Sequence, residues 1–203
     1  MRIRSHPTTA VWPDDRPNVL DEAHRVPSPG TYLIDPDRTV VEFVARHLVV
    51  ARVHGQFRGI TGTVTVDDVP ERSGVEATID ATTVDTGIPA RDKHLRSADF
   101  FDVERFPTIS FRSTALEPGT APRQWILAGL VDVLGSSQPV RLVARVERAW
   151  ESAAGRPSIS VSASTVVDRE SWGLTWNARA ETGGLLIGPM VDVNVLVQAV
   201  TAT

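Results

Sequence analysis

The amino-acid sequence predicts an all-β fold, an extended antiparallel barrel of eight strands with a short helix near its mouth. From residue 31 onward, apolar and polar side chains alternate with a period of two, which is typical of strands with one buried and one solvated face. Many of these runs exceed the usual strand length of about 5–6 residues. At about 3.3 Å per residue and a tilt near 40°, they would line a bore on the order of 25–30 Å long. A sandwich core does not need that length, so the pattern favours a barrel around a long, thin ligand.

Eight alternating runs account for most of the chain, and turn-forming residues separate several of them. The runs cover residues 31–47, 55–67, 73–84, 107–116, 123–134, 138–150, 157–168 and 187–200. Small side chains recur on the faces predicted to point inward, which suits a cavity and equally suits a tapering barrel. These small residues are Ala45, Ala77, Ala81, Gly129, Ala144 and Ala163.

Length and composition indicate one barrel domain over residues 30–203, preceded by a leader over residues 1–29 that we expect to be disordered or extended. The leader holds five of the chain's 14 prolines and shows no apolar period. A formal net charge of −4 gives no footprint for nucleic acid, and the absence of cysteine excludes disulfides and thiolate sites. No apolar run of signal-peptide or membrane-span length is present, so we expect a cytoplasmic protein without a membrane span.

Two segments interrupt the strand pattern. In residues 86–106, Pro89 suits a first helical turn, and Leu95, Ala98 and Phe101 share one face at helical spacing. This spacing predicts a short helix and loop across the barrel mouth. Residues 168–188 hold two of the five tryptophans, Trp172 and Trp176, and aromatic rings in a long connection are typical of a seal over a pocket.

These two segments also carry a family resemblance. Residues 94–107 (HLRSADFFDVERFP) and 169–177 (RESWGLTWN), followed by 181–184 (ETGG), resemble the signature loops of the YceI-like family. His47-Leu48, residues 55–57 (GQF) and residues 75–80 (VEATID) fit the same family in the same order, so the resemblance spans residues 30–200. It implies a lipocalin-like eight-stranded barrel that binds polyisoprenoid compounds, including quinones with long prenyl tails, and that is not known for catalysis. Many members carry a signal peptide, and the polar leader departs from them there.

We therefore expect a non-enzymatic protein that carries or stores a long apolar lipid, an isoprenoid quinone or a polyprenyl chain, with no cofactor beyond this ligand. Strand parity and the two mouth segments select the candidate ligand-binding residues, although each apolar one also suits a plain core position. The candidates are Phe43, His47, Phe57, Ile79, Leu95, Phe100, Phe101, Phe111, Leu127, Trp172, Leu174 and Trp176.

The polar residues leave several alternatives open. His47 lies on the inward parity, where it would contact a ligand headgroup or donate to a backbone carbonyl. A metal site is disfavoured, because His54 is an odd seven residues from His47 and therefore on the opposite strand face, and because His94 has no histidine partner at ligand spacing. The charged run over residues 91–105 suits a solvated helix face, with Arg96 and Asp99 clamping the loop to the barrel.

Two other functions compete with lipid carriage. One is a stress-related interaction module with a packed barrel and no lipid, and the other is a small hydrolase, although no G-x-S-x-G motif is present. Bulky side chains filling the bore would favour the module, and a polar bore with a carboxylate or histidine would favour the hydrolase. A hydrophobic mouth also offers a surface through which a homodimer can form.

Overall fold

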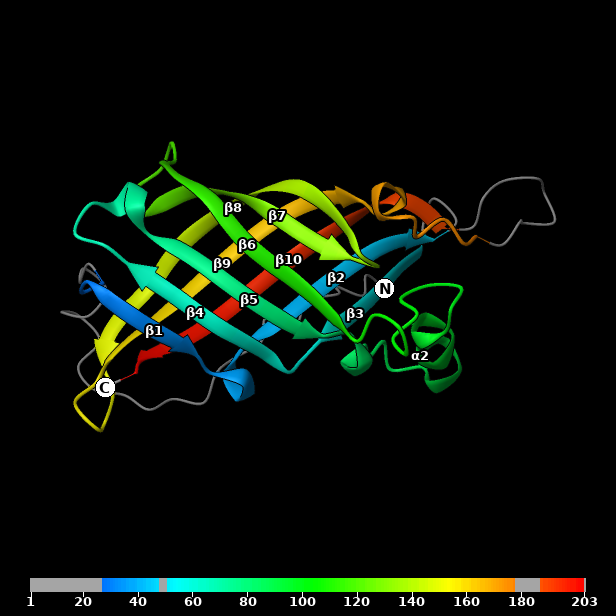
Figure 1. Ribbon diagram of the computed structural model, residues 1–203, viewed down its shortest axis with the longest axis horizontal. Coiled ribbons are helices and arrows are strands. Elements are labelled where there is room, and N and C mark those ends of the chain that lie inside the picture. The colour runs from blue at the N-terminus through cyan, green and yellow to red at the C-terminus, as the bar shows by residue number, and fades with distance from the viewer. Residues whose placement is uncertain (1–26, 48–50, 178–186, 203) are drawn as a thin grey trace, which may run out of the picture.

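The computed structural model describes residues 27–47, 51–177 and 187–202, and they form one long antiparallel barrel (Figure 1). Its strands are β1 Gly30–Ile34, β2 Val40–His47, β3 Ala51–Phe57, β4 Ile60–Val66, β5 Gly74–Asp80, β6 Thr108–Pro118, β7 Gln124–Val133, β8 Ser136–Glu151, β9 Pro157–Asp168 and β10 Ile187–Thr201. The order in the sheet is β1-β4-β5-β6-β7-β8-β9-β10-β2-β3, and pairing of β1 with β10 closes the barrel. The predicted leader falls almost wholly outside the described residues.

The eight predicted runs correspond to these ten strands because two runs are interrupted. The run at 31–47 breaks at Asp35, whose carboxylate accepts the Asp37 amide and begins the 3₁₀ turn η1, Pro36–Arg38. The run predicted from residue 55 begins at Ala51 and breaks at Gly59, which has a φ of +65°. Both halves of the first run pair with β10, β1 at its end and β2 along its first part, so the eight-stranded barrel is preserved.

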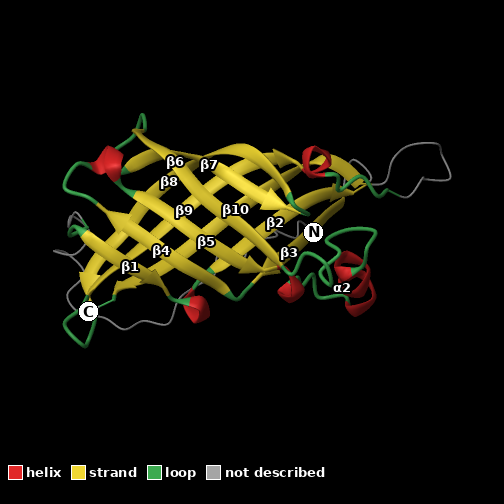
Figure 2. Cartoon of the chain, in the orientation of Figure 1, coloured by secondary structure: helices red, strands yellow, loops and turns green. Residues whose placement is uncertain are grey.

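Apart from η1, which follows β1 along the side of the barrel, the helical elements lie toward its two ends (Figure 2). They are η2 Pro70–Arg72, η3 Ala81–Thr83, the helix α2 Pro89–Arg96 and η4 Arg169–Trp172. The strand predicted to continue to residue 84 ends at Asp80, because the Asp80 carboxylate caps η3 through the Thr82 amide. Ala81 therefore lies in this turn, and its predicted place on an inward strand face is wrong.

The segment between η3 and β6 replaces strand pairing at one edge of the barrel. Within the described residues, one β-bridge, between Gln56 and Asp85, joins the free edge of β3 to this segment. Phe57 of β3 meets Phe101 edge-on, with ring centroids 5.4 Å apart. The helix α2 ends at Arg96, earlier than the predicted face through Ala98 and Phe101, and the following residues form turns. The helix thus lies at the barrel mouth, beside β3 (Figure 1).

The opposite end of the barrel is filled by packed side chains. Tyr32, Ile159 and Ala199 come from β1, β9 and β10 and have 1% or less of their surface exposed. The Tyr32 hydroxyl donates to the Ser28 carbonyl oxygen at 2.7 Å, which satisfies its one polar group, and burial raises the pKa of this phenol. This end is therefore a conventional core.

A glycine makes room for an aromatic ring inside the wall. Gly55 pairs with Phe43 across β2 and β3, and a Cβ added to Gly55 would lie 2.2 Å from Phe43 Cζ. Position 55 therefore requires glycine because the Phe43 ring occupies the space that a Cβ would need. Gly129 is similar, since a Cβ there would lie 2.4 Å from the Phe111 ring.

We predict that Gly55→Ala lowers the free energy of unfolding by about 1–3 kcal/mol, because the new methyl group overlaps the Phe43 ring. In a Phe43→Ala background the same substitution should cost less than about 0.5 kcal/mol, since the ring is gone. Urea denaturation of the four proteins measures this coupling. Equal costs in both backgrounds would contradict the proposed packing.

Candidate functional site

An apolar cavity of about 960 Å³ runs inside the barrel toward the mouth. Inward-facing residues of each of the ten strands line it, in the alternation that the pleat requires. On β10 these are Val191, Val193, Val195 and Val197. The cavity also reaches exposed residues of the mouth, because its wall includes Ile88, which is 49% exposed, and Ala90. A chain-like apolar molecule therefore has both a bore and an entrance.

All but one of the ligand-binding candidates predicted from the sequence lie together in the wall of this cavity. The side chain of the remaining candidate is not described. Those that line the cavity are Phe43, Phe57, Ile79, Leu95, Phe100, Phe101, Phe111, Leu127, Trp172, Leu174 and Trp176. His47 is the last residue of β2, and its side chain falls outside the described residues. That these side chains contact a ligand stays a prediction. The small residues Ala45, Ala77, Ala144 and Ala163 also line the cavity and leave space in it.

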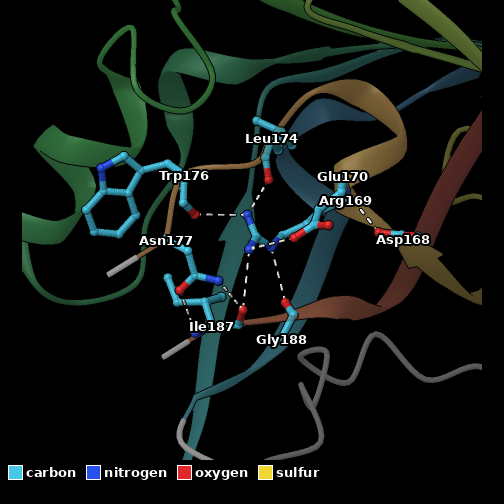
Figure 3. A network of polar contacts seen from close by, with 8 residues as sticks. All are labelled: Asp168, Arg169, Glu170, Leu174, Trp176, Asn177, Ile187 and Gly188. Carbon is cyan, nitrogen blue, oxygen red and sulfur yellow. Dashed lines mark hydrogen bonds and ion pairs between the residues drawn. The ribbon is translucent and has the colours of Figure 1, made fainter. Parts of the chain in front are cut away.

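A buried arginine organises one side of the mouth (Figure 3). The Arg169 side chain is 6% exposed, and its guanidinium Nη1 donates to the carbonyl oxygens of Leu174 and, at 3.1 Å, Trp176. Its Nε donates to the Gly188 carbonyl at 3.1 Å and its Nη2 to the Ile187 carbonyl at 3.4 Å. One side chain therefore ties the segment after η4 to the beginning of β10.

Two further side chains fix this segment. Asn177 donates to the Ile187 carbonyl at 2.6 Å and accepts the Ile187 amide at 2.9 Å, as a neighbouring strand would. The indole N–H of Trp172 donates to the Val131 carbonyl at 2.9 Å, so this buried ring is held against β7. Residues 169–177, which carry Trp172 and Trp176, are thus held in place as one wall of the cavity.

The other side of the mouth is the segment carrying α2. Arg96 clamps it, with Nε donating to the Thr82 carbonyl at 2.7 Å and Nη2 to the Val84 carbonyl at 2.6 Å. Asp99, expected to share that role, instead lies 3.2 Å from His94 Nε2, and among the described residues no hydrogen bond or ion pair joins it to a strand. The charged run is also less solvated than expected, because Asp92 is buried and accepts the Thr86 amide at 2.9 Å.

Aromatic rings join the two sides of the mouth. The His94 ring on α2 meets Trp176 edge-on at a centroid distance of 4.4 Å and Phe100 at 5.2 Å. Phe100 and Trp176 themselves lie 5.2 Å apart. This His94–Phe100–Trp176 cluster brings together residues that are far apart in the sequence, and all three line the cavity.

A family model for the YceI-like domain matches residues 32–199, which is most of the chain. The chain belongs to the YceI-like family. Protein YceI of Salmonella newport is 35% identical over 118 residues, a region that spans 57% of this chain and 61% of the relative. The match therefore covers less than two thirds of that relative's length.

Solved YceI-like structures share the barrel. BcnA of Burkholderia cenocepacia has a TM-score of 0.69 at 18% identity, covering 81% of this chain and 98% of that chain. A polyisoprenoid binding domain from Saccharophagus degradans, implicated in plant cell wall breakdown, has a TM-score of 0.64 at 15% identity, covering 86% and 99%. At these identities the likeness concerns the fold, and it confirms the predicted eight-stranded barrel.

Sequence reasoning missed the basic side chains in the wall of this YceI-like barrel, namely Arg52, Arg91 and Arg169. The spacing of residues in the sequence could have identified two of these arginines. Arg169 continues the inward parity of β9 through Thr165 and Val167, and Arg91 precedes His94 by three residues on one helix face. Arg52 follows no such rule, since its neighbour Val53 occupies the inward position.

Neither a metal cluster nor a membrane-spanning helix is found in the described ranges. No group of three or more His, Cys, Asp or Glu residues there could hold a metal ion. No helix within residues 27–47, 51–177 and 187–202 is long and apolar enough to cross a membrane.

We predict that Arg169→Met lowers the free energy of unfolding by about 2–4 kcal/mol, because it leaves buried carbonyl oxygens without donors. Arg145, on the outer wall with its side chain 58% exposed, provides the control. Arg145→Met should change stability by less than about 0.5 kcal/mol. Urea denaturation followed by tryptophan fluorescence measures both, and an unchanged midpoint for Arg169→Met would contradict the clamp.

Proposed function

We propose that this YceI-like protein binds and carries, or stores, a long apolar lipid chain inside its barrel, without chemical conversion of the lipid. An isoprenoid quinone or a polyprenyl chain is the proposed ligand class. The observation that carries the proposal is the apolar cavity of about 960 Å³, which lies at the upper end of the range of about 300–1,000 Å³ for ligand pockets. The relative from Saccharophagus degradans, described as a polyisoprenoid binding domain, supports the same ligand class.

The cavity also weighs against the two competing functions. An interaction module with a packed barrel would fill its bore with bulky side chains, whereas here alanines in the wall leave part of the bore open. A hydrolase of the kind considered would have a polar bore with a carboxylate or a histidine. Most of the lining is apolar and no Asp or Glu of the described residues belongs to it, although His94 lines the cavity at the mouth. The absence of a cofactor, the homodimer and the cytoplasmic location stay predictions of the sequence.

Apolar burial supplies the binding free energy in this proposal. Each buried methylene contributes about 0.8 kcal/mol, so affinity should rise with chain length until the bore is full. The cavity exists before the ligand arrives, and two fixed segments hold its mouth, so little ordering cost accompanies binding.

Mass spectrometry of the protein purified without detergent, from a host that makes isoprenoid quinones, tests this proposal. We expect a stoichiometric adduct of a few hundred daltons in the native spectrum that disappears on denaturation and identifies the lipid. A protein mass that stays bare after incubation with quinones and polyprenols would refute lipid carriage.

A substitution that fills the bore should remove the ligand and leave the fold intact. Ala163 on β9 lines the cavity, whereas its neighbour Ser164 is exposed on the outer face. We expect Ala163→Phe to lose the native adduct and Ser164→Phe to keep it, with matching circular dichroism spectra. Retention of the adduct by Ala163→Phe would place the ligand elsewhere.

A further inference from the structure

The ionisable side chains in the cavity wall are all of basic residue types. Arg52 of β3, Arg91 and His94 of α2, and Arg169 of η4 line the cavity, and no acidic residue of the described chain does. The protein as a whole is acidic, with a formal net charge of −4, so a basic lining is contrary to its average composition. All four residues belong to segments at the mouth (Figure 1).

Arg169 places a buried positive charge next to the bore. Its hydrogen-bond partners are neutral carbonyl oxygens, and its one ion pair within the described chain is with Glu170, at 3.6 Å, whose side chain is 42% exposed. Burial lowers the pKa of Arg169 against the attraction of Glu170 and Asp168. In a water-poor cavity, such a charge attracts an anion more strongly than an exposed one does.

Arg91 and Arg52 have donors available at the cavity edge. Thr86 fixes the Arg91 guanidinium, accepting from Nε through its hydroxyl at 2.7 Å and from Nη2 through its carbonyl at 2.9 Å. Three of the five guanidinium N–H groups then have no partner among the described residues. Arg52 is exposed and makes no hydrogen bond or ion pair within the described part of the chain.

The carboxylates near the mouth are engaged away from the bore. Asp92 accepts from the Thr86 amide and hydroxyl, and Asp99 contacts His94 on the solvent side with a side chain 61% exposed. Hydrogen bonds from the Gly87 amide and the Gln56 side chain hold the pKa of Asp85 below its usual range. Asp99 contacts the His94 ring, but within the described residues no ion pair joins a carboxylate to Arg52 or Arg91.

We propose that the mouth of the barrel binds an anionic headgroup, a phosphate or a carboxylate, so that the ligand is a long-chain anionic amphiphile. This inference rests on the proposed lipid-binding function and, of the ligands named there, favours a chain with an anionic head over a quinone. Guanidinium groups donate paired hydrogen bonds to phosphate and carboxylate oxygens, whereas a quinone or an alcohol offers them no charge.

Ligands matched in chain and different in head test this inference. Geranylgeranyl monophosphate is compared with geranylgeraniol, and palmitate with hexadecanol, by calorimetry of the lipid-free protein below the critical micelle concentrations. We expect each anion to bind about tenfold more tightly than its alcohol, and high salt to reduce this preference. A preference for the phosphate without one for palmitate would assign the site to phosphates.

Variants locate the preference. Arg91→Gln should weaken phosphate binding about tenfold and Arg52→Gln about threefold, with alcohol binding unchanged. Arg112→Gln is the matched control, because Arg112 is an exposed outer-wall residue paired with Glu76 at 3.5 Å. We expect that variant to bind both ligands as the unaltered protein does.

The outcomes separate the two proposals. Equal affinities for anion and alcohol would overturn the headgroup inference and leave lipid binding in place. No binding by any of the four ligands would overturn both. If Arg52→Gln and Arg91→Gln weakened alcohol and phosphate equally, the basic residues would have a structural role only, and the inference would fail.

Discussion

The hydrogen-bond register of β10 determines the rest of the barrel, because this one strand pairs with β9, β1 and β2. A slip of one residue would turn Val191, Val193 and Val195 outward and their polar neighbours inward. The same register places Gly188 and Ile187 where Arg169 can reach their carbonyl oxygens. Barrel closure, the apolar wall and the ordered mouth therefore depend on one set of strand pairings.

The sequence was sufficient for the barrel because its strands obey a simple period. Phe43 and Leu127 could be assigned to the inside by parity alone, and both line the cavity. The breaks at Asp35 and Gly59 and the end of β5 at Asp80 were not predicted, because caps and positive φ angles depend on local contacts that a period of two does not encode.

The mouth was harder to predict because its residues act through distant backbone groups. Arg169 satisfies carbonyl oxygens that lie up to 19 residues away, and a pattern of side-chain polarity contains no record of such partners. The prediction for Asp99 failed in the opposite way. A long-range contact with the barrel was expected, but the described ion pair of Asp99 is with its near neighbour His94. The alternation of inward and outward residues identified the apolar side chains of the cavity wall, but it did not identify the arginines there.

The bond pattern around β3 makes one side of the barrel a seam. Elsewhere, neighbouring strands are joined by ladders, of which the shortest is the three residue pairs of β1 with β10. Across the free edge of β3, the described contacts are the two backbone bonds between Gln56 and Asp85 and side-chain contacts such as Phe57 with Phe101. Parting the barrel there breaks few hydrogen bonds, whereas widening it between β9 and β10 or between β7 and β8 breaks a long ladder. The barrel wall is therefore least cross-linked along the free edge of β3, next to the mouth segment that carries α2.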